Sequence, residues 1–533
     1  MSGWNFADVW ETVAEALPDA QAQAQGKRRL TWAETDRRAN GVAAALIGLG
    51  VGRQDKVAQY LYNGPEYLES MFAAYKAGLV PVNTNYRYGD EELLYLWDNA
   101  DAVAVVFHGA FTERIEPLRP KLTKVKGWLW VDDGHGPCPA WATPYEEAAE
   151  SHPERVVAPW GRSGDDLYML YTGGTTGMPK GVMWRQDDLY MILASQGANR
   201  DPESGLEGLR QSLTQPGMVG MPACPLMHGT GAMSSMTAMC QGGSVVTLEG
   251  RSFDVEELLD TIQAERVNSI AIVGDTFAKP MLAALEANPG RWDISSLLLM
   301  ISSGVMWSEA TKQGLLRHHP GMILADAFSS SEALGMGSSI SSAGATSGTA
   351  KFRLGENARV ITEDGRDVEP GSGETGMVAV KGRVPVGYYK DEEKSARTFR
   401  VIEGERYSIP GDFATVEADG TLKLLGRGSV CINTGGEKVY PEEVEEAIKE
   451  HPSVADAVAV GLPDDRFGET ICAMVQAKDG QSVDEASIIA HVKTKLASYK
   501  APKRVLAIDT VGRGPNGKVD YKRLRDEAIS RVG

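Results

Sequence analysis

Apolar and polar positions follow two different periods along the first part of the chain. Thr31 and Glu34 form a capping box at the head of an amphipathic pattern that ends near Gly48, which predicts a helix. The expected elements after it are a strand at 56–62, a helix at 66–76, a strand at 79–82, a helix from Asp90 and a strand at 102–107. Helices interleaved with short apolar strands predict an α/β fold built in layers.

The pattern changes near residue 410. Short alternating strands are expected at 413–416 and 422–425, and the glycine-rich segment 426–429 that follows indicates a flexible joint near Ser429. Pro441 stands where the next helix should begin, and the glutamates after it suit the positive end of a helix dipole. We therefore expect a large N-terminal domain at 1–428 and a small, mobile α+β C-terminal domain at 429–533.

Composition excludes several classes of protein. The 533 residues are 42% hydrophobic and 24% charged, which is typical of globular domains and not of disordered or fibrous chains. No apolar run approaches the roughly 18 residues that a membrane span needs, and the start of the chain has no secretory pattern, so we expect a cytoplasmic protein. The five cysteines form no CxxC pair, which argues against disulfide and zinc frameworks.

Charge is distributed unevenly. The net charge of -18 repels nucleic acid, so a phosphate-bearing ligand needs a local reversal of charge. Residues 493–531 supply one, with eleven Lys or Arg against four acids. A solvated basic face on a terminal helix explains this composition equally well.

The strongest local signal is the segment 171–182, in which glycines and threonines surround Lys180 directly after an apolar strand candidate at 167–170. Glycines let backbone N–H groups converge, hydroxyls add donors and the lysine adds charge, a combination that suits a polyphosphate. It is not a Walker loop, because a Walker lysine is followed directly by Ser or Thr, whereas Lys180 lies between Pro179 and Gly181. Considered by itself, the segment could instead be a flexible surface turn.

A second glycine-rich segment, 512–518, has Walker spacing and follows a strand candidate at 504–508. Val519 stands where a magnesium-binding hydroxyl is required, and too little chain follows for a parallel sheet. Considered by itself, Lys518 is a solvated lysine in a turn.

Together these segments resemble the adenylate-forming superfamily of acyl-CoA synthetases, adenylation domains and firefly luciferase. The resemblance covers nearly the whole chain, and its motifs occur in the family's order. They are the Thr/Gly segment 172–181, Pro225–His228, Phe328–Glu332, Gly387-Tyr388, Gly411-Asp412, Gly426-Arg427, Gly435–Pro441 and Gly517-Lys518. Segments 171–184 and 426–446 are most similar to actinobacterial ligases of steroid side chains and other bulky acids.

The resemblance implies a reaction. The family activates a carboxylate with ATP, releases pyrophosphate and transfers the acyl group from AMP to CoA. It also implies a large domain that includes a small distorted β-barrel, and a homodimer is common in the family. ATP/AMP, Mg²⁺, CoA and a carboxylic acid or its acyl adenylate are the expected ligands, with no nucleic acid and no membrane span.

Residue roles carry over by motif. Lys518 matches the lysine at the reacting α-phosphate, Glu332 the magnesium carboxylate and His228 the gate of the acyl pocket. Phe328 would lie against adenine with Ser329 close to the nucleotide, and Ser331 near the α-phosphate. Asp412 would accept the ribose hydroxyls beside Arg427. The expected phosphate-loop residues are Thr172, Gly173, Gly174, Thr175, Thr176, Gly177 and Lys180.

For the second step the family rotates its small domain about the hinge. Lys518 then leaves, and Gly435 and Gly436 open a channel for the pantetheine arm, with Lys438 among the basic residues near CoA. Six methionines between Met218 and Met239 lie among small residues, which suits either a wide apolar pocket or ordinary core packing.

Departures from the family keep alternatives open. The family commonly has Ser at 173, Tyr-Gly at 328–329 and Asp or Lys at 429. An enzyme that performs only the thioester step on a ready-made adenylate is one alternative, and a non-catalytic nucleotide-binding regulator is another. A luciferase-like oxygenase is a further alternative, but no motif in this sequence specifies oxygen chemistry. For a carrier-loading adenylation domain we would expect a phosphopantetheine carrier segment after Lys518, and none is visible there.

Overall fold

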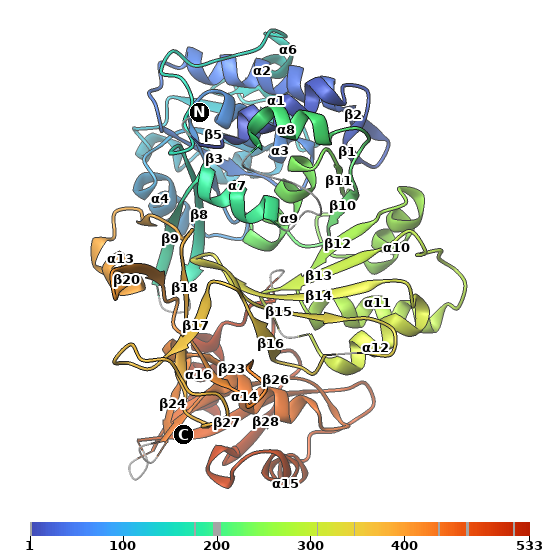
Figure 1. The fold of residues 1–533 in the computed structure, drawn as a ribbon, viewed down its shortest axis with the longest axis vertical. Coiled ribbons are helices and arrows are strands. Elements are labelled where there is room, and N and C mark those ends of the chain that lie inside the picture. The colour runs from blue at the N-terminus through green and yellow to red at the C-terminus, as the bar shows by residue number, and fades with distance from the viewer. Residues whose placement is uncertain are drawn as a thin grey trace.

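The computed structural model describes residues 3–174, 177–195, 204–305, 307–345, 347–434, 437–464, 468–514 and 517–532. For residues 429, 437 and 438 the description is limited to the backbone. Figure 1 shows the chain running from blue helices and strands at the top, through a central yellow sheet, to an orange and red C-terminal unit at the bottom.

An eight-stranded sheet forms the upper part of the described residues, in the order β19-β9-β8-β4-β3-β5-β6-β7. The strands from β8 through β4, β3, β5 and β6 to β7 pair in parallel, whereas β9 pairs antiparallel with both β8 and β19. All seven residues of β5 are buried, as the continuous apolar run of a parallel strand covered on both faces requires. The strands are β3 (Lys56–Tyr60), β4 (Val80–Asn83), β5 (Ala102–His108), β6 (Gly127–Val131), β7 (Thr143–Pro144), β8 (Leu167–Gly174), β9 (Gly177–Arg185) and β19 (Gly387–Tyr388).

A second sheet of fifteen described strands crosses the middle of the molecule. It is parallel from β1 through β11, β10, β12 and β13 to β14, and the strands beyond β14 pair antiparallel. The strands are β1 (Gln21–Gln25), β2 (Arg28–Thr31), β10 (Val219–Pro222), β11 (Ser244–Thr247), β12 (Ser269–Ile272), β13 (Leu299–Ser303), β14 (Ile323–Ser330), β15 (Ala333–Ser341), β16 (Lys351–Leu354), β17 (Ala358–Ile361), β18 (Gly376–Lys381), β20 (Phe399–Ile402), β21 (Glu405–Ser408), β22 (Asp412–Val416) and β23 (Thr421–Arg427).

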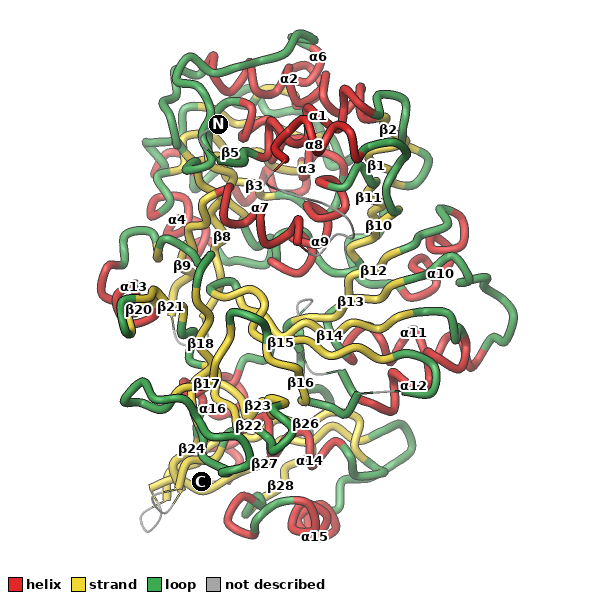
Figure 2. Tube along the Cα trace, in the orientation of Figure 1, coloured by secondary structure: helices red, strands yellow, loops and turns green. Residues whose placement is uncertain are grey.

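The expected small β-barrel takes a different form. Within the described residues the antiparallel strands after β14 continue the second sheet, and no ring of paired strands closes. The physical reason lies in the pairing of β15 with β16 and of β16 with β23, which joins this β unit to the parallel strands and leaves β20 as an edge. Figure 2 shows these yellow strands between the two groups of red helices.

Helices cover the sheets, and their starts follow the expected signals. Thr31 and Glu34 form both hydrogen bonds of the capping box at α2, and Pro65 occupies the first turn of α3. The larger-domain helices are α1 (Phe6–Ala16), α2 (Trp32–Gly48), α3 (Pro65–Lys76), α4 (Asp90–Asn99), α5 (Thr112–Ile115), α6 (Tyr145–Glu150), α7 (Gln186–Ser195), α8 (Gly205–Ser212), α9 (Gly229–Cys240), α10 (Val255–Ala264), α11 (Asp275–Ala287), α12 (Glu309–His318) and α13 (Glu392–Thr398). The α/β layering predicted from the sequence is confirmed.

A third sheet with its own hydrophobic core forms the C-terminal unit. Its strands are β24 (Ile432–Thr434), β25 (Glu437–Val439), β26 (Val454–Asp464), β27 (Gly468–Ala477) and β28 (Arg504–Ala507). Its helices are α14 (Pro441–Lys449), α15 (Glu485–Lys495) and α16 (Tyr521–Val532). The unit lies below β16 in Figure 1, at the end of the molecule opposite the eight-stranded sheet.

Membrane spans and disulfides can be checked in the described residues. Among the described residues, no helix is long and apolar enough to cross a membrane. All five cysteines belong to the described part of the chain, and no disulfide joins any two of them.

Candidate functional site

The expected phosphate loop is part of a β-hairpin. β8 runs through Gly174 and β9 starts at Gly177, and Thr172 pairs with Lys180 across the ladder. Lys180 therefore lies on a strand, because the pairing of β8 and β9 continues into the glycine-rich segment. Its ammonium forms an ion pair with Asp391.

Glu332 lies between β14 and β15, at the end of the central sheet. Its side chain is 7% exposed, and Oε1 accepts a 2.8 Å hydrogen bond from the Tyr388 hydroxyl. Burial, with Glu332 beside it, raises the pKa of Tyr388 well above its ordinary value, so the phenol keeps the proton that it donates. The backbone is held as well: the Ser331 carbonyl accepts the Trp184 indole N–H and the Glu332 carbonyl accepts the Ser408 hydroxyl.

Asp412 and Arg427 face each other on adjacent strands. They are register partners of β22 and β23, and Arg427 Nε donates to Asp412 Oδ1 at 3.2 Å. The charge of Asp412 raises the pKa of Arg427 further above its ordinary value, so the guanidinium stays charged. Asp412 Oδ2 is buried, and among the described residues it has no hydrogen-bond partner. A buried oxygen without a donor is what a ribose diol would satisfy.

The segment that carries Lys518 packs against the large domain. Gly517 has φ +68°, and a Cβ there would overlap Val305 and come within 2.9 Å of Val273. The turn is closed by hydrogen bonds from the Gly514 N–H to the Lys518 carbonyl and from the Gly517 N–H to the Gly514 carbonyl. Glycine at 517 thus allows the close approach of the two units, and Lys518 follows it into the site.

Lys518 belongs electrostatically to the same group as Glu332, Asp412 and Arg427. Loss of hydration lowers the pKa of its amine, the positive charge of Arg427 lowers it further, and the two carboxylates raise it. Its side chain still contacts solvent, so protein surrounds the ammonium without sealing it off. The structure therefore brings together four of the residues that the sequence indicated from four separate motifs.

His228 is the N-cap residue of α9, and its neighbour Met227 accepts a 2.7 Å hydrogen bond from the Asn83 side chain. Desolvation, with Lys518 nearby, lowers the pKa of His228 to about 3. The imidazole is consequently neutral at physiological pH and cannot act there as a charged anion ligand.

The two residues expected nearest adenine lie at the end of β14. Phe328 is 8% exposed, and its ring lies 5.4 Å from the Phe352 ring within a hydrophobic cluster. The Ser329 hydroxyl accepts a hydrogen bond from the Gly335 N–H, so its side chain stabilises the β14–β15 hairpin. The substitution of serine for the usual glycine thus has a local hydrogen-bond partner.

Several expected residues lie wholly or partly outside the description. Thr175 and Thr176, and likewise Gly435 and Gly436, are outside the described residues, as is the side chain of Lys438. Gly173, Gly174 and Gly177 are described as backbone of β8 and β9. Their roles stay predictions.

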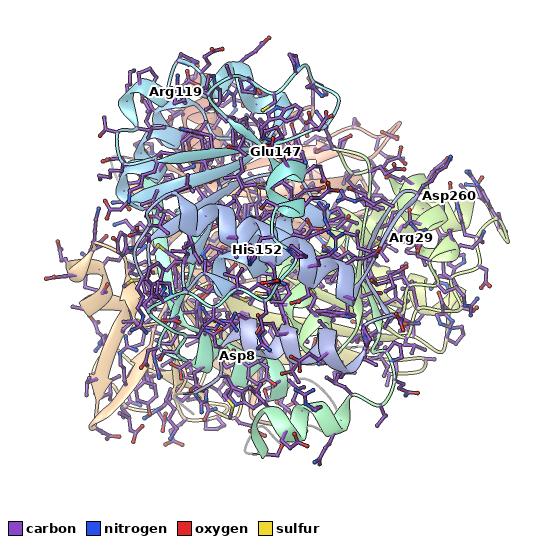
Figure 3. All side chains as sticks on the ribbon, turned by 90° about the horizontal axis from the view of Figure 1, so that it is seen from above. Asp8, Arg29, Arg119, Glu147, His152 and Asp260 are labelled. Atoms are coloured by element: carbon purple, nitrogen blue, oxygen red, sulfur yellow. The ribbon has the colours of Figure 1, made fainter. Side chains whose placement is uncertain are left out.

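Two cavities lie away from this group. One of about 460 Å³ opens between β22, β23 and α14, with Lys423, Tyr440 and Lys500 in its lining. A smaller one of about 180 Å³ is lined partly by Arg29 and Asp260, which Figure 3 shows on the same side of the molecule. Neither cavity contains an expected nucleotide residue, so neither changes the location of the site.

The motif pattern missed Asp391 and Lys394. Asp391 is the N-cap residue of α13, where Oδ1 accepts the Lys394 N–H at 3.0 Å while Oδ2 pairs with Lys180. An aspartate three residues before a lysine, shortly after the Gly387-Tyr388 motif, is the only sequence signal, and it indicates a helix start without indicating a phosphate site.

The fold and the site define a class of protein. A layered α/β domain presents a glycine-rich hairpin, a buried carboxylate at a sheet end and an Asp–Arg pair, and a second unit delivers a lysine to them. These are the parts of an adenylate-forming enzyme.

Comparison with known proteins gives the family. Residues 10–389 match the AMP-binding enzyme family and residues 443–518 match the AMP-binding enzyme C-terminal domain. The chain therefore belongs to the AMP-binding enzyme family.

Named relatives span nearly the whole chain. The chain is 40% identical over 537 residues to a medium/long-chain-fatty-acid and 3-oxocholest-4-en-26-oate CoA ligase of Mycolicibacterium smegmatis, covering 99% of this chain and 97% of that protein. It is 41% identical to a 3-oxocholest-4-en-26-oate CoA ligase of Rhodococcus rhodochrous, covering 98% and 96%. Its fold matches that of ATP-bound MatB from Rhodopseudomonas palustris, with a TM-score of 0.82, 24% identity and coverage of 99% and 100%.

Proposed function

We propose that this enzyme is an AMP-forming acyl-CoA ligase that converts a bulky or long-chain carboxylic acid to its CoA thioester through an acyl adenylate. The observation that carries the proposal is the position of Lys518 beside Glu332, Asp412 and Arg427, where charges from two units of the fold meet. The CoA ligase activity of the named relatives supports the same reaction.

In the first step a carboxylate oxygen of the acid bonds to the α-phosphorus of ATP. The bond from that phosphorus to the bridging oxygen breaks, and pyrophosphate leaves with the electron pair. An anion attacks an anion, so the ammonium of Lys518 has to offset charge at the α-phosphate; a cation about 4 Å away contributes on the order of 4 kcal/mol at an effective dielectric near 20. Asp412 would hold the ribose through the buried Oδ2.

The residues present fit a magnesium ion that arrives with the nucleotide. Mg²⁺ usually takes one or two carboxylates and several phosphate or water oxygens. Glu332 offers such a carboxylate, oriented by the Tyr388 hydroxyl at one oxygen. No cluster of three metal-binding side chains occurs in the described part of the chain, which suits an ion held largely by phosphates. When bound, the ion would neutralise charge on the polyphosphate.

In the second step the CoA thiolate attacks the acyl carbon, and AMP leaves. We infer that the C-terminal unit, residues 429–533, rotates about a hinge near Ser429, so that Lys518 withdraws and the Gly435–Gly436 face approaches. His228 would then stand at the entrance to the acyl pocket as a neutral side chain.

The relatives' substrates suggest which class of carboxylic acid this enzyme uses. Met236 and Met239 of α9 are fully buried and pack in the hydrophobic core. These methionines therefore do not indicate how wide the acyl pocket is. The relatives' substrates, medium and long-chain fatty acids and 3-oxocholest-4-en-26-oate, are the first acids to test. The cytoplasmic location and the homodimer stay predictions.

The test supplies ATP, magnesium, CoA and a panel of these acids, and measures pyrophosphate and acyl-CoA separately. We expect both products, in equal amounts, from at least one acid. Acyl-CoA from a synthetic acyl adenylate, but from no acid with ATP, would instead identify a thioester-forming half-reaction enzyme. Nucleotide binding with neither product would contradict the ligase proposal in favour of a regulatory protein.

A further inference from the structure

Lys394 lies in the first turn of α13, between the phosphate hairpin and Glu332. Its ammonium is 4.2 Å from the centre of the Tyr388 ring, and the hydroxyl of that ring donates to Glu332. Its backbone N–H is held by Asp391, whose other oxygen binds Lys180. The side chain of Lys394 therefore contacts the tyrosine that binds Glu332, the expected metal carboxylate. Its backbone is held by the aspartate that pairs with Lys180, the expected phosphate lysine.

The ammonium of Lys394 differs in its ion pairing from the other cations of the site. Within the described part of the chain, no carboxylate lies at ion-pair distance from its ammonium, whereas Lys180 pairs with Asp391 and Arg427 with Asp412. Lys394 is half-buried and its pKa is lowered by desolvation, with Glu332 acting in the opposite direction and Lys180 lowering it further.

This arrangement has a consequence for ligand binding. A partly desolvated cation that packs on a ring and lacks an ion-pair partner gains more from an incoming anion than a solvated one does. Lys390, four residues earlier, shows the contrast: it is exposed, it lies over the Tyr389 ring and it is paired with Asp101. The two lysines share a segment and each packs on a tyrosine ring, but among the described residues only Lys390 has a carboxylate at ion-pair distance.

We propose that Lys394 is a further phosphate-binding residue of this enzyme, which contacts the β- and γ-phosphates of ATP and stabilises the pyrophosphate that leaves in the first step. The inference rests on the proposed function for the identity of the nucleotide. It assigns Lys394 to the polyphosphate together with Lys180, while Lys518 serves the α-phosphate.

The experiment compares ligands that differ in their phosphates. Calorimetric titration measures the binding of α,β-methylene-ATP with magnesium, of pyrophosphate with magnesium, and of AMP to the full-length protein and to Lys394→Ala. We expect the variant to weaken both polyphosphates by about 10-fold or more, as loss of a charge-assisted contact implies, and to leave AMP within about 2-fold. Lys394→Arg should restore most of the loss, and Lys390→Ala should bind all three ligands as the parent does.

Two results would overturn the assignment. Unchanged affinity of Lys394→Ala for both polyphosphates would mean that the ammonium does not reach them. Equal weakening of AMP and the ATP analogue would mean that Lys394 acts only by supporting Tyr388. These binding readouts need no acid and no CoA, so a failure of the ligase proposal would appear separately, as absent acyl-CoA with nucleotide binding intact.

Discussion

Single residues determine how the nucleotide can be held. The carboxylates and cations of the site come from segments far apart in sequence, and each is positioned by a named contact, such as the Tyr388 hydroxyl on Glu332 or the Arg427 guanidinium on Asp412. Asp412 Oδ2 is buried and has no donor among the described residues, which favours the proposed contact with the ribose hydroxyls.

Asp412→Asn should raise the KM for ATP by about 10- to 100-fold, because one buried acceptor for the ribose becomes a donor and Arg427 loses its counter-ion. The rate of thioester formation from a synthetic adenylate at saturation should change less. Asp419→Asn is the matched control, since Asp419 is exposed at the tip of the same hairpin. A KM for ATP equal to that of the parent would contradict the ribose assignment.

His228 should remain neutral across the working pH range. Its folded-state pKa of about 3 lies below the ordinary value of 6.5, so its contribution to stability is present above pH 6.5 and is lost as the pH falls toward 3. The measurement is an NMR titration of the His228 ring, with His228→Gln to assign the signal. We expect no titration between about pH 5 and 8; a midpoint near 6.5 would refute the desolvated environment.

The element scale shows what sequence pattern can and cannot predict. Capping residues and apolar periods located α2, β3, α3, β4, α4 and β5 to within a few residues, because those signals are local. The antiparallel pairing that opens the expected barrel, and the strand character of Lys180, depend on partners far along the chain. The role proposed for Lys394 was invisible for the same reason, since it depends on contacts with Tyr388 and Asp391 and not on a motif.

Gly426 should resist substitution because of one contact between elements. It has φ +132°, and a Cβ there would overlap the Glu442 carboxylate of α14. Gly426→Ala should lower the free energy of unfolding by about 2 kcal/mol more than Gly420→Ala, a control with φ +81° and open space around its Cβ position. Equal losses, measured by denaturant unfolding, would show that Glu442 moves aside.

Glu442 should make the stability depend on pH. Burial raises its pKa above the ordinary 4.5, with Glu445 and Asp412 as neighbouring negative charges, and among the described residues its Oε2 has no hydrogen-bond partner. The folded state therefore binds the proton of the Glu442 carboxyl more tightly than the unfolded state does. The contribution of this protonation to the free energy of unfolding is fully present below pH 4.5 and is lost as the pH rises through the raised pKa.

Replacement by a neutral side chain tests this contribution. The melting temperature of Glu442→Gln should fall less than that of the parent between about pH 5 and 8. Glu450→Gln is the control, because Glu450 is exposed at the other end of α14 and pairs with Lys495. Parallel pH profiles for parent and Glu442→Gln would contradict the buried, protonated state.

At the scale of the whole molecule, the acidic chain concentrates its positive charge where phosphate is expected. Residues 430–533 are nearly neutral within a protein of net charge -18, and their basic tail carries Lys518 into the site. The contact at Gly517 with Val273 and Val305 ties the position of this lysine to the arrangement of the two units. A rotation of the small unit would therefore withdraw the ammonium that we propose for the first step.

The most direct test of this account measures both half-reactions for Lys518→Ala with dodecanoate, or with the panel acid that the parent enzyme prefers. We expect adenylate formation from ATP to fall by about 100-fold or more, while thioester formation from the synthetic adenylate and CoA stays within about 3-fold. Lys522→Ala, on the exposed part of the same tail, should leave both rates unchanged. Equal loss of both half-reactions in a folded Lys518→Ala protein would contradict the assignment of this lysine to the first step.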